Sequence, residues 1–250
     1  MVVSISAFNH PLNLVIHQTV TAFAAGCPVV IKPATTTPLS CLAFVALLKE
    51  AGMPEDWCQA VICDNDTAQQ LATDPRVGFL SFIGSSSVGW YLRSQLAPGT
   101  RCALEHGGVA PVIADINADF DAMLPLLVKG GFYHAGQVCV SVQKVFVHED
   151  DCDALATALV ALADKLTVGD PASDQTAVFT RDLDVAMDSV RKLNATAVMV
   201  NDHTAFRVDW MPFGGRGSSG LGMGMGMGSI PYSIHEMTRE KLMVIKSPGL

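Results

Sequence analysis

The first half of the chain alternates between short apolar runs and longer amphipathic segments. The runs are rich in β-branched residues, which is typical of buried strands, and the longer segments repeat apolar residues every three or four positions, as one face of a helix does. The pattern predicts strands at 1–7, 28–32, 57–63 and 77–83, and helices at 11–25, 38–52, 66–73 and from the turn at 84–87 to residue 96. This alternation predicts an α/β fold with a doubly wound parallel sheet.

The second half continues the alternation with less regular spacing. Strands are predicted at 109–114, 143–147, 177–180 and 196–200, and helices at 120–132, 150–166 and 183–193. A repeat of glycine and methionine over 222–228 cannot pack as a regular element, so we expect a loop there. Residues 241–246 are predicted to form a terminal strand, which is a candidate for pairing with the edge of another subunit.

Composition and charge argue against several classes of protein. Half of the 250 residues are apolar, too many for a disordered chain, yet no apolar run reaches the roughly 18 residues of a membrane span. The net charge of −8 argues against a nucleic-acid partner, which needs a basic face. The seven cysteines form no Cys-x-x-Cys pair and the histidines lack ligand spacing, so we expect reduced thiols and no metal site. Because the first residues lack the features of a signal peptide, we expect a cytoplasmic protein.

One cysteine is a candidate nucleophile. Cys139 lies in the segment GQVCV, and Glu105 lies 139 − 105 = 34 residues earlier, in a predicted glycine-rich turn with the sequence LEHGG. A thiolate is the strongest side-chain nucleophile at neutral pH, and a carboxylate can accept the proton of a thiol or of a water. The alternative is a structural cysteine, since most cysteines are small buried hydrophobic residues.

Both segments belong to a longer series of motifs. In chain order the series is Phe8-Asn9-His10-Pro11, Ile31-Lys32-Pro33-Ala34, Phe82-Ile83-Gly84-Ser85, Glu105-x-Gly107-Gly108, Gly136-Gln137-x-Cys139 and Pro212-Phe213-Gly214-Gly215. Six motifs in this order resemble the aldehyde dehydrogenase superfamily. The resemblance implies a partial Rossmann-like dinucleotide-binding domain over 1–103, a smaller, partial α/β catalytic domain over 104–235 and a C-terminal strand over 236–250 for oligomerisation. It also implies NAD or NADP as the cofactor, an aldehyde as the substrate and a homo-oligomer.

The resemblance assigns three catalytic residues. Cys139 would attack the aldehyde to form a thiohemiacetal, from which a hydride passes to the nicotinamide, and would then carry the product as a thioester. Glu105 would deprotonate the water that hydrolyses this thioester, and the Asn9 side chain would donate to the developing oxyanion together with the Cys139 backbone N–H. From the residues alone, Glu105 could equally be a solvated loop residue, and Asn9 could hold the turn before Pro11.

The resemblance also assigns a set of cofactor-binding residues, namely Phe8, Lys32, Thr35, Gly84 and Ser85. Lys32 would bind the adenosine ribose, and Gly84 and Ser85 would open a helix whose N–H groups suit a pyrophosphate, although Gly-Ser is also an ordinary helix start. Thr35 stands where many NAD-preferring members have a glutamate, so NADP is admissible as well as NAD.

A few further residues are candidates for the substrate site. Phe8, Phe206, Trp210 and Phe213 could line an apolar aldehyde tunnel, although core packing is the simpler explanation for each of them. His203 and Arg207 could meet a polar end of the substrate.

Two stretches of the family pattern are missing. Family members are expected to carry a long segment ahead of the position of Met1, and a second stretch is missing at the junction of Thr176 and Ala177. The second stretch would contain a Glu-x-Phe-Gly-Pro motif that holds the nicotinamide half of the cofactor, and the chain has no such motif. Two alternatives to a dehydrogenase therefore stay open. One is a non-catalytic protein that binds a dinucleotide or other subunits, and the other is a thioester or ester hydrolase that needs no hydride acceptor.

Overall fold

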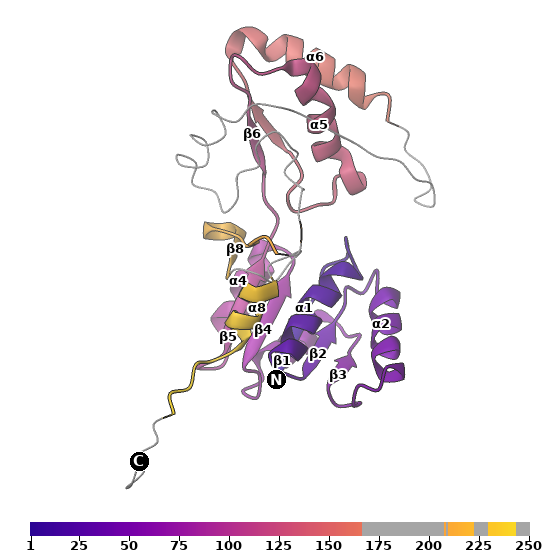
Figure 1. Ribbon diagram of the computed structural model, residues 1–250, viewed down its shortest axis with the longest axis vertical. Coiled ribbons are helices and arrows are strands. Elements are labelled where there is room, and N and C mark those ends of the chain that lie inside the picture. Colours follow the sequence, from indigo (N-terminus) through magenta and orange to yellow (C-terminus); the bar gives the residue numbers. More distant parts are fainter. Residues whose placement is uncertain (167–207, 209, 223–229, 244–250) are drawn as a thin grey trace, which may run out of the picture. The chain divides into compact units, whose positions relative to one another are not determined.

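The computed structural model describes residues 1–166, 208, 210–222 and 230–243, which form two units (Figure 1). The first unit contains Met1–Glu105 and the described residues of 209–214 and 220–250. The second contains the described residues of 106–208 and 215–219. Each unit has a sheet of its own.

The first unit is a six-stranded sheet with helices on both faces (Figure 1). Its strands are β1 (Val2–Ile5), β2 (Val29–Lys32), β3 (Cys58–Ala60), β4 (Phe79–Ile83), β5 (Arg101–Glu105) and β8 (Gly220–Leu221). Its helices are α1 (Asn13–Ala24), α2 (Leu39–Glu50), α3 (Asn65–Thr73), α4 (Ser86–Gln95) and α8 (Ile230–Met237). The strand order is β3-β2-β1-β4-β5-β8, in which the first five strands are parallel and β8 is antiparallel to β5. The predicted doubly wound parallel sheet is confirmed.

Each face of this sheet has its own apolar core, because successive residues of a strand point to opposite faces. On one face Val2 and Phe79 pack with residues of α1, α2 and α8. On the other face Val3 and Leu80 pack with residues of α3 and α4. A strand that is buried on both faces has a nearly continuous apolar sequence, which explains why the sequence pattern identified these strands.

Local sequence explains where several helices begin and end. α3 follows Asp64, whose side chain accepts a hydrogen bond from the N–H of Thr67 at 2.8 Å, as an N-cap does. α2 is followed by Gly52, whose φ of 90° is a left-handed conformation that glycine adopts without steric penalty. The helix was predicted to end at residue 52, and α2 ends two residues earlier, at Glu50.

A polar side chain lies within the core, where α1 packs on the sheet. Gln18 is fully buried, and its Nε2 donates to Oγ of Ser81 at 2.7 Å and to the carbonyls of Ser81 and Ile5 at 3.3 Å. Buried polar groups that lose their partners are unfavourable, so these bonds favour one placement of α1 over β1 and β4.

We expect Gln18→Ala to lower the free energy of unfolding by about 2–3 kcal/mol, because it leaves the Ser81 hydroxyl unpaired and opens a cavity. Urea denaturation followed by circular dichroism measures this change. Gln70→Ala is the matched control: this residue is an exposed glutamine of α3, and its replacement should change stability by less than about 0.5 kcal/mol. Equal effects of the two substitutions would refute the structural role of Gln18.

The second unit is built around a parallel strand pair. β6 (Pro111–Ile113) pairs with β7 (Lys144–Phe146), and α5 (Phe120–Phe132) packs against α6 (Cys152–Ala163). The short turns η1 (Tyr133–Gly136), η2 (Glu149–Asp151) and η3 (Gly217–Ser219) complete the described part of this unit. The strands and helices predicted within 109–166 are all present; α5 has the predicted bounds, and the others are shorter.

The structure also departs from the sequence predictions. It contains β5, β8 and α8, none of which was predicted, and β5 places Glu105 at the end of a strand instead of in a glycine-rich turn. The predicted strand at 241–246 is absent from its described part, 241–243, because no described strand lies beside these residues. Residues 236 and 237, within the predicted C-terminal strand of 236–250, belong to α8. The elements predicted at 177–180, 183–193 and 196–200, and the loop after Gly222, lie outside the described residues.

Candidate active site

The predicted cofactor residues gather at the carboxyl edge of the first unit's sheet. The parallel register pairs Ile5 with both Lys32 and Phe82, and Ile83 with Glu105, so the strands end side by side. From β1 the chain proceeds to β2 and β3 on one side and then to β4 and β5 on the other, so the strand order reverses between β1 and β4. Ligands of open α/β sheets bind at such a switch point, at the carboxyl ends of the strands.

The loops after β1 and β2 are joined at this edge. Phe8 lies in the loop after β1 and is 48% exposed, and its carbonyl accepts a hydrogen bond from the Thr37 hydroxyl at 3.2 Å. Lys32 is the last residue of β2 and is buried, whereas Thr35 is exposed in the turn that follows. Asn9 is half-buried in the same loop as Phe8. The sequence pattern gave no indication of the contribution of Thr37.

The turn from β4 to α4 is as tight as the sequence suggests. A Cβ atom on Gly84 would lie 2.7 Å from the buried Phe82 ring, so a larger residue there would require this ring to shift. The Gly84 N–H already donates to the Glu105 carbonyl at 3.0 Å. Ser85 is the exposed N-cap residue of α4. The N–H groups that could meet a pyrophosphate are therefore those of the first turn of α4, and Gly84 contributes space instead of a donor.

Glu105 lies at the same edge and is well buried. It is the last residue of β5, pairs with Gly220 of β8, and is 6% exposed. This burial excludes the alternative of a solvated loop residue. The strand fixes the backbone of this carboxylate more firmly than the predicted turn would.

In the second unit, the segment after Glu105 is bonded to the turn that contains Cys139. The Gly108 N–H donates to the Cys139 carbonyl at 3.1 Å, and a Cβ atom on Gly108 would lie 3.3 Å from that oxygen. The Gln143 side chain in turn donates to the Gly108 carbonyl at 3.0 Å. Two motifs that are far apart in the sequence, Glu-x-Gly-Gly and Gly-Gln-x-Cys, are thus joined through their backbones.

The cysteines differ in burial, and therefore in expected reactivity. Cys139 is half-buried, whereas Cys41 of α2 and Cys58 of β3 lie in the core. Burial raises the pKa of the Cys41 thiol and of the Cys58 thiol to about 11. Burial also raises the pKa of Cys102 above its usual range. These three thiols are poor nucleophiles at neutral pH, because the thiolate is the reactive form.

Several candidate substrate residues cannot be placed. Phe206, His203 and Arg207 lie outside the described residues, as does the junction of Thr176 and Ala177. Trp210 is described and is 72% exposed.

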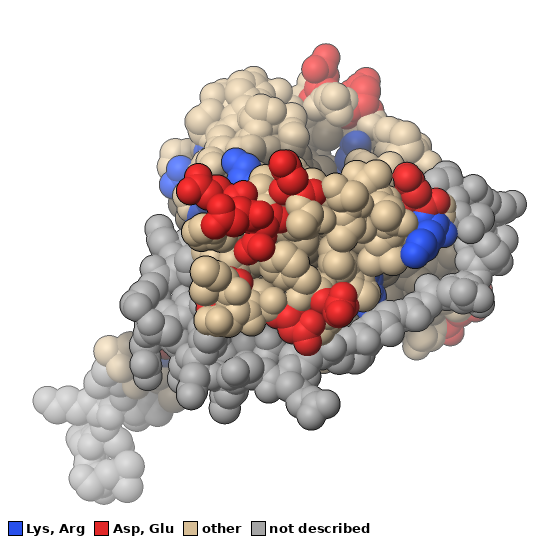
Figure 2. Space-filling model, turned by 90° about the horizontal axis from the view of Figure 1, so that it is seen from above, with Lys and Arg blue, Asp and Glu red and all other residues tan. Residues whose placement is uncertain are grey.

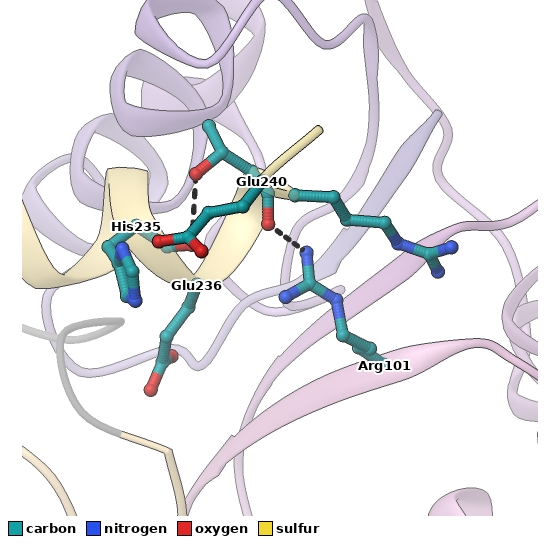
Figure 3. A pocket seen from close by; sticks show the side chains of 6 residues that line it. Arg101, His235, Glu236 and Glu240 are labelled. Carbon is teal, nitrogen blue, oxygen red and sulfur yellow. Dashed lines mark hydrogen bonds between the residues drawn. The ribbon is translucent and has the colours of Figure 1, made fainter. Parts of the chain in front are cut away.

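The first unit also contains a hollow, which is seen from close by in Figure 3. Its volume is about 560 Å³, and it is lined by Arg101, His235, Glu236, Thr238, Arg239 and Glu240. Arg101 begins β5, so this hollow lies at the amino end of that strand, opposite the predicted cofactor edge. The Arg101 guanidinium donates a hydrogen bond to the Thr238 carbonyl at 2.8 Å. None of the predicted catalytic or cofactor residues lines it, and we assign it no part in the chemistry.

Surface charge and metal-ligating residues give little further information about the function of this site. The face shown in Figure 2 displays several groups of Asp and Glu and fewer Lys and Arg. In the described ranges there is no group of three or more His, Cys, Asp or Glu residues that could hold a metal ion. None of the helices in these ranges combines the length and the apolar character that a membrane crossing requires.

Comparisons with known proteins identify the family. The model of the aldehyde dehydrogenase family matches residues 1–178 and 173–243, and the two matches meet where the sequence pattern indicates a missing stretch. The 3-sulfolactaldehyde dehydrogenase of Priestia megaterium is 28% identical over 333 residues, which cover 98% of this chain and 69% of that relative.

Two solved structures of dehydrogenases are also similar to this chain. The NADP-dependent glyceraldehyde-3-phosphate dehydrogenase from Bacillus halodurans C-125, complexed with NADP, matches with a TM-score of 0.86 and 25% identity, over 96% of this chain and 68% of that one. An aldehyde dehydrogenase of Mycobacterium tuberculosis, complexed with NAD+, matches with a TM-score of 0.66 and 33% identity, over 68% of this chain and 36% of that one. The family model covers well over half of the residues, and the chain belongs to the aldehyde dehydrogenase family.

Proposed function

We propose that this protein oxidises an aldehyde to a carboxylic acid with NAD or NADP, through a thioester on Cys139. The observation that carries the proposal is the gathering of Asn9, Lys32, Glu105 and the start of α4 at the carboxyl edge of the sheet, around its switch point. A cytoplasmic location and a homo-oligomeric state stay predictions from the sequence.

The residues fit the adenosine and pyrophosphate parts of a dinucleotide. Lys32 offers a cation at the end of β2, and the first turn of α4 offers backbone N–H groups to a pyrophosphate. The solved relatives contain NADP in one case and NAD+ in the other, and Thr35 is neutral, so neither cofactor is excluded by charge.

The proposed chemistry divides one difficult reaction into two easier ones. The Cys139 thiolate forms a bond to the carbonyl carbon, and the Asn9 side chain and the Cys139 N–H donate to the oxygen that becomes negative. NAD or NADP, when bound, supplies the acceptor for the hydride. Glu105 then takes a proton from a water, the water oxygen bonds to the thioester carbon, and the C–S bond breaks to release the acid and the thiolate.

A cofactor titration tests the binding part of this proposal. We expect Lys32→Ala to weaken dinucleotide binding about tenfold, because it removes a charge-assisted hydrogen bond, and to weaken NADP binding more than NAD binding. Thr35→Glu should shift the preference toward NAD, since its charge would repel a 2′-phosphate. Isothermal titration calorimetry of the purified 250-residue chain measures both effects.

The matched control for this titration is Lys49→Ala. Lys49 lies in the last turn of α2, where it pairs with Glu55 at 3.4 Å, and α2 runs away from the carboxyl edge. This variant should bind both cofactors normally. Undiminished binding by Lys32→Ala, or equal losses in the two lysine variants, would contradict the assignment of Lys32.

A second candidate function is ester or thioester hydrolysis without hydride transfer. The match to the Priestia relative extends over 333 residues, which is 333 − 250 = 83 more than this chain contains, so the relative has residues that this chain lacks. The family resemblance places the nicotinamide-holding motif in the missing stretch. Cys139, Asn9 and Glu105 suffice for hydrolysis, which needs no hydride acceptor.

A further inference from the structure

Unfavourable backbone conformations are concentrated near Cys139. In the described part of the chain, the non-glycine residues with positive φ are Ala110 at 40°, His134 at 54° and Ala135 at 55°. Gly136 follows with a φ of 70°, so three successive residues ahead of Cys139 are left-handed. Side chains disfavour this conformation, because Cβ comes too close to the backbone.

Several bonds hold this turn in place. The Ser141 hydroxyl donates to the Gly136 carbonyl at 3.3 Å, and the Ser141 N–H donates to the Val138 carbonyl at 3.0 Å. The Gln137 N–H donates to the His134 carbonyl at 3.1 Å. Ser141 is only 2% exposed, so its hydroxyl is shielded from competing water. A left-handed alanine persists only where its surroundings determine the backbone in this way.

The turn also limits where Cys139 can lie. A Cβ atom on Gly136 would lie 3.2 Å from the Gly131 carbonyl, so the chain leaves the end of α5 along a tightly packed path. On the other side, the Cys139 carbonyl accepts the Gly108 N–H at 3.1 Å. The nucleophile is therefore held from both directions, by the left-handed turn before it and by Gly108 beside it.

We infer that the left-handed turn 134–136, held by the buried Ser141 hydroxyl, positions the Cys139 thiol for attack, which makes Ala135 and Ser141 positioning residues. This inference rests on the proposed function, in which Cys139 is the nucleophile. The strain would then serve this positioning, because a turn with alanine and histidine has fewer accessible backbone conformations than a glycine-rich turn. Neither residue contacts substrate in this scheme, and both act through the backbone of Cys139.

The test uses the acylation of Cys139 by p-nitrophenyl acetate in the full 250-residue chain. In that step the Cys139 sulfur bonds to the acetyl carbon, the ester C–O bond breaks, nitrophenolate leaves with the bonding electrons, and the thiol proton passes to solvent or to a base. The burst of nitrophenolate gives the rate, and mass spectrometry locates the acetyl group.

Two variants are expected to slow acylation while moving stability in opposite directions. Ala135→Gly should raise the midpoint of thermal unfolding by about 2–4 °C, because glycine tolerates positive φ, and should slow acylation about tenfold because the turn is freer. Ser141→Ala should also slow acylation about tenfold, but should lower the midpoint because the turn loses its anchor. A merely structural role would make stability and acylation change together, or leave acylation unchanged.

Ala110→Gly is the matched control. It relieves a positive φ in the same unit but lies outside the turn, so the midpoint should rise and the acylation rate should stay within about twofold. Normal acylation in both Ala135→Gly and Ser141→Ala would overturn this inference alone. An equal loss in Ala110→Gly would also overturn it, since general loosening would then explain the effect. Absence of acylation in the unchanged chain would overturn the proposed function as well.

Discussion

Cys139→Ala is expected to abolish both aldehyde oxidation and ester hydrolysis, with a loss of at least about a thousandfold in each. In the proposed mechanism both reactions pass through a covalent bond to the Cys139 sulfur, and alanine offers no atom that can form it. The assays are reduction of NAD or NADP in the presence of an aldehyde panel, and release of nitrophenolate from an activated ester. The acyl adduct seen by mass spectrometry should disappear together with both activities.

Cys152→Ala is the control for this substitution. Cys152 is an exposed thiol at the start of α6, in the same unit as Cys139, and its loss should leave both activities intact. If Cys139→Ala retained ester hydrolysis, another nucleophile would be at work and the proposed mechanism would fail.

Alkylation with iodoacetamide checks the same assignment without a substitution. At pH 8, a thiol with a pKa of about 11, such as Cys41 or Cys58, is only about one part in a thousand thiolate, and both are also shielded in the core. Cys139 should therefore react much faster than these two, and faster than the exposed Cys152 if its surroundings stabilise the thiolate. Uniform labelling, or a fast site at Cys27 or Cys102, would contradict the assignment.

The sequence predicted the strands and helices whose pattern is local, and missed those that depend on distant partners. β1, β2 and β4 are apolar because both of their faces are covered, so a short window is enough to identify them. β5 has a charged residue at each end, Arg101 and Glu105, and it is a strand because it pairs with β4 and β8. The short helix α8 packs against α1, which lies some 200 residues earlier in the sequence. No local pattern contains that information.

The candidate site was likewise predictable only in part. Motifs indicated which residue types to expect, and the parallel topology explains why Asn9, Lys32 and Glu105 come to one edge of a sheet. The hydrogen bond from Thr37 to the Phe8 carbonyl and the support that Ser141 gives to the left-handed turn depend on atomic placement. Threonine and serine are common in loops, so their presence alone predicts neither role.

The ratio of the two activities decides between the dehydrogenase proposal and the hydrolase alternative. We expect aldehyde oxidation to be about a hundredfold slower than in a full-length relative, such as the Priestia enzyme, because a displacement of about 1 Å between hydride donor and acceptor can have an effect of that size. The groups proposed to bind the adenosine and pyrophosphate parts, Lys32 and the start of α4, are present in the structure. The motif that the family resemblance assigns to the nicotinamide half is absent from the sequence. Dinucleotide should thus bind while its reactive end is poorly restrained.

Ester hydrolysis should be affected much less, because Cys139, Asn9 and Glu105 carry it without a hydride acceptor. Both activities should be measured on one preparation of this chain and on the relative, with saturating NAD or NADP, and the ratio of oxidation to hydrolysis compared. A ratio of oxidation to hydrolysis about a hundredfold lower in this chain would support a protein that retains acyl transfer but has lost most of its hydride transfer. A ratio equal to that of the relative, with robust oxidation, would show that residues elsewhere in the chain or in another subunit restrain the nicotinamide. In that case the dehydrogenase proposal would stand and the hydrolase alternative would be rejected.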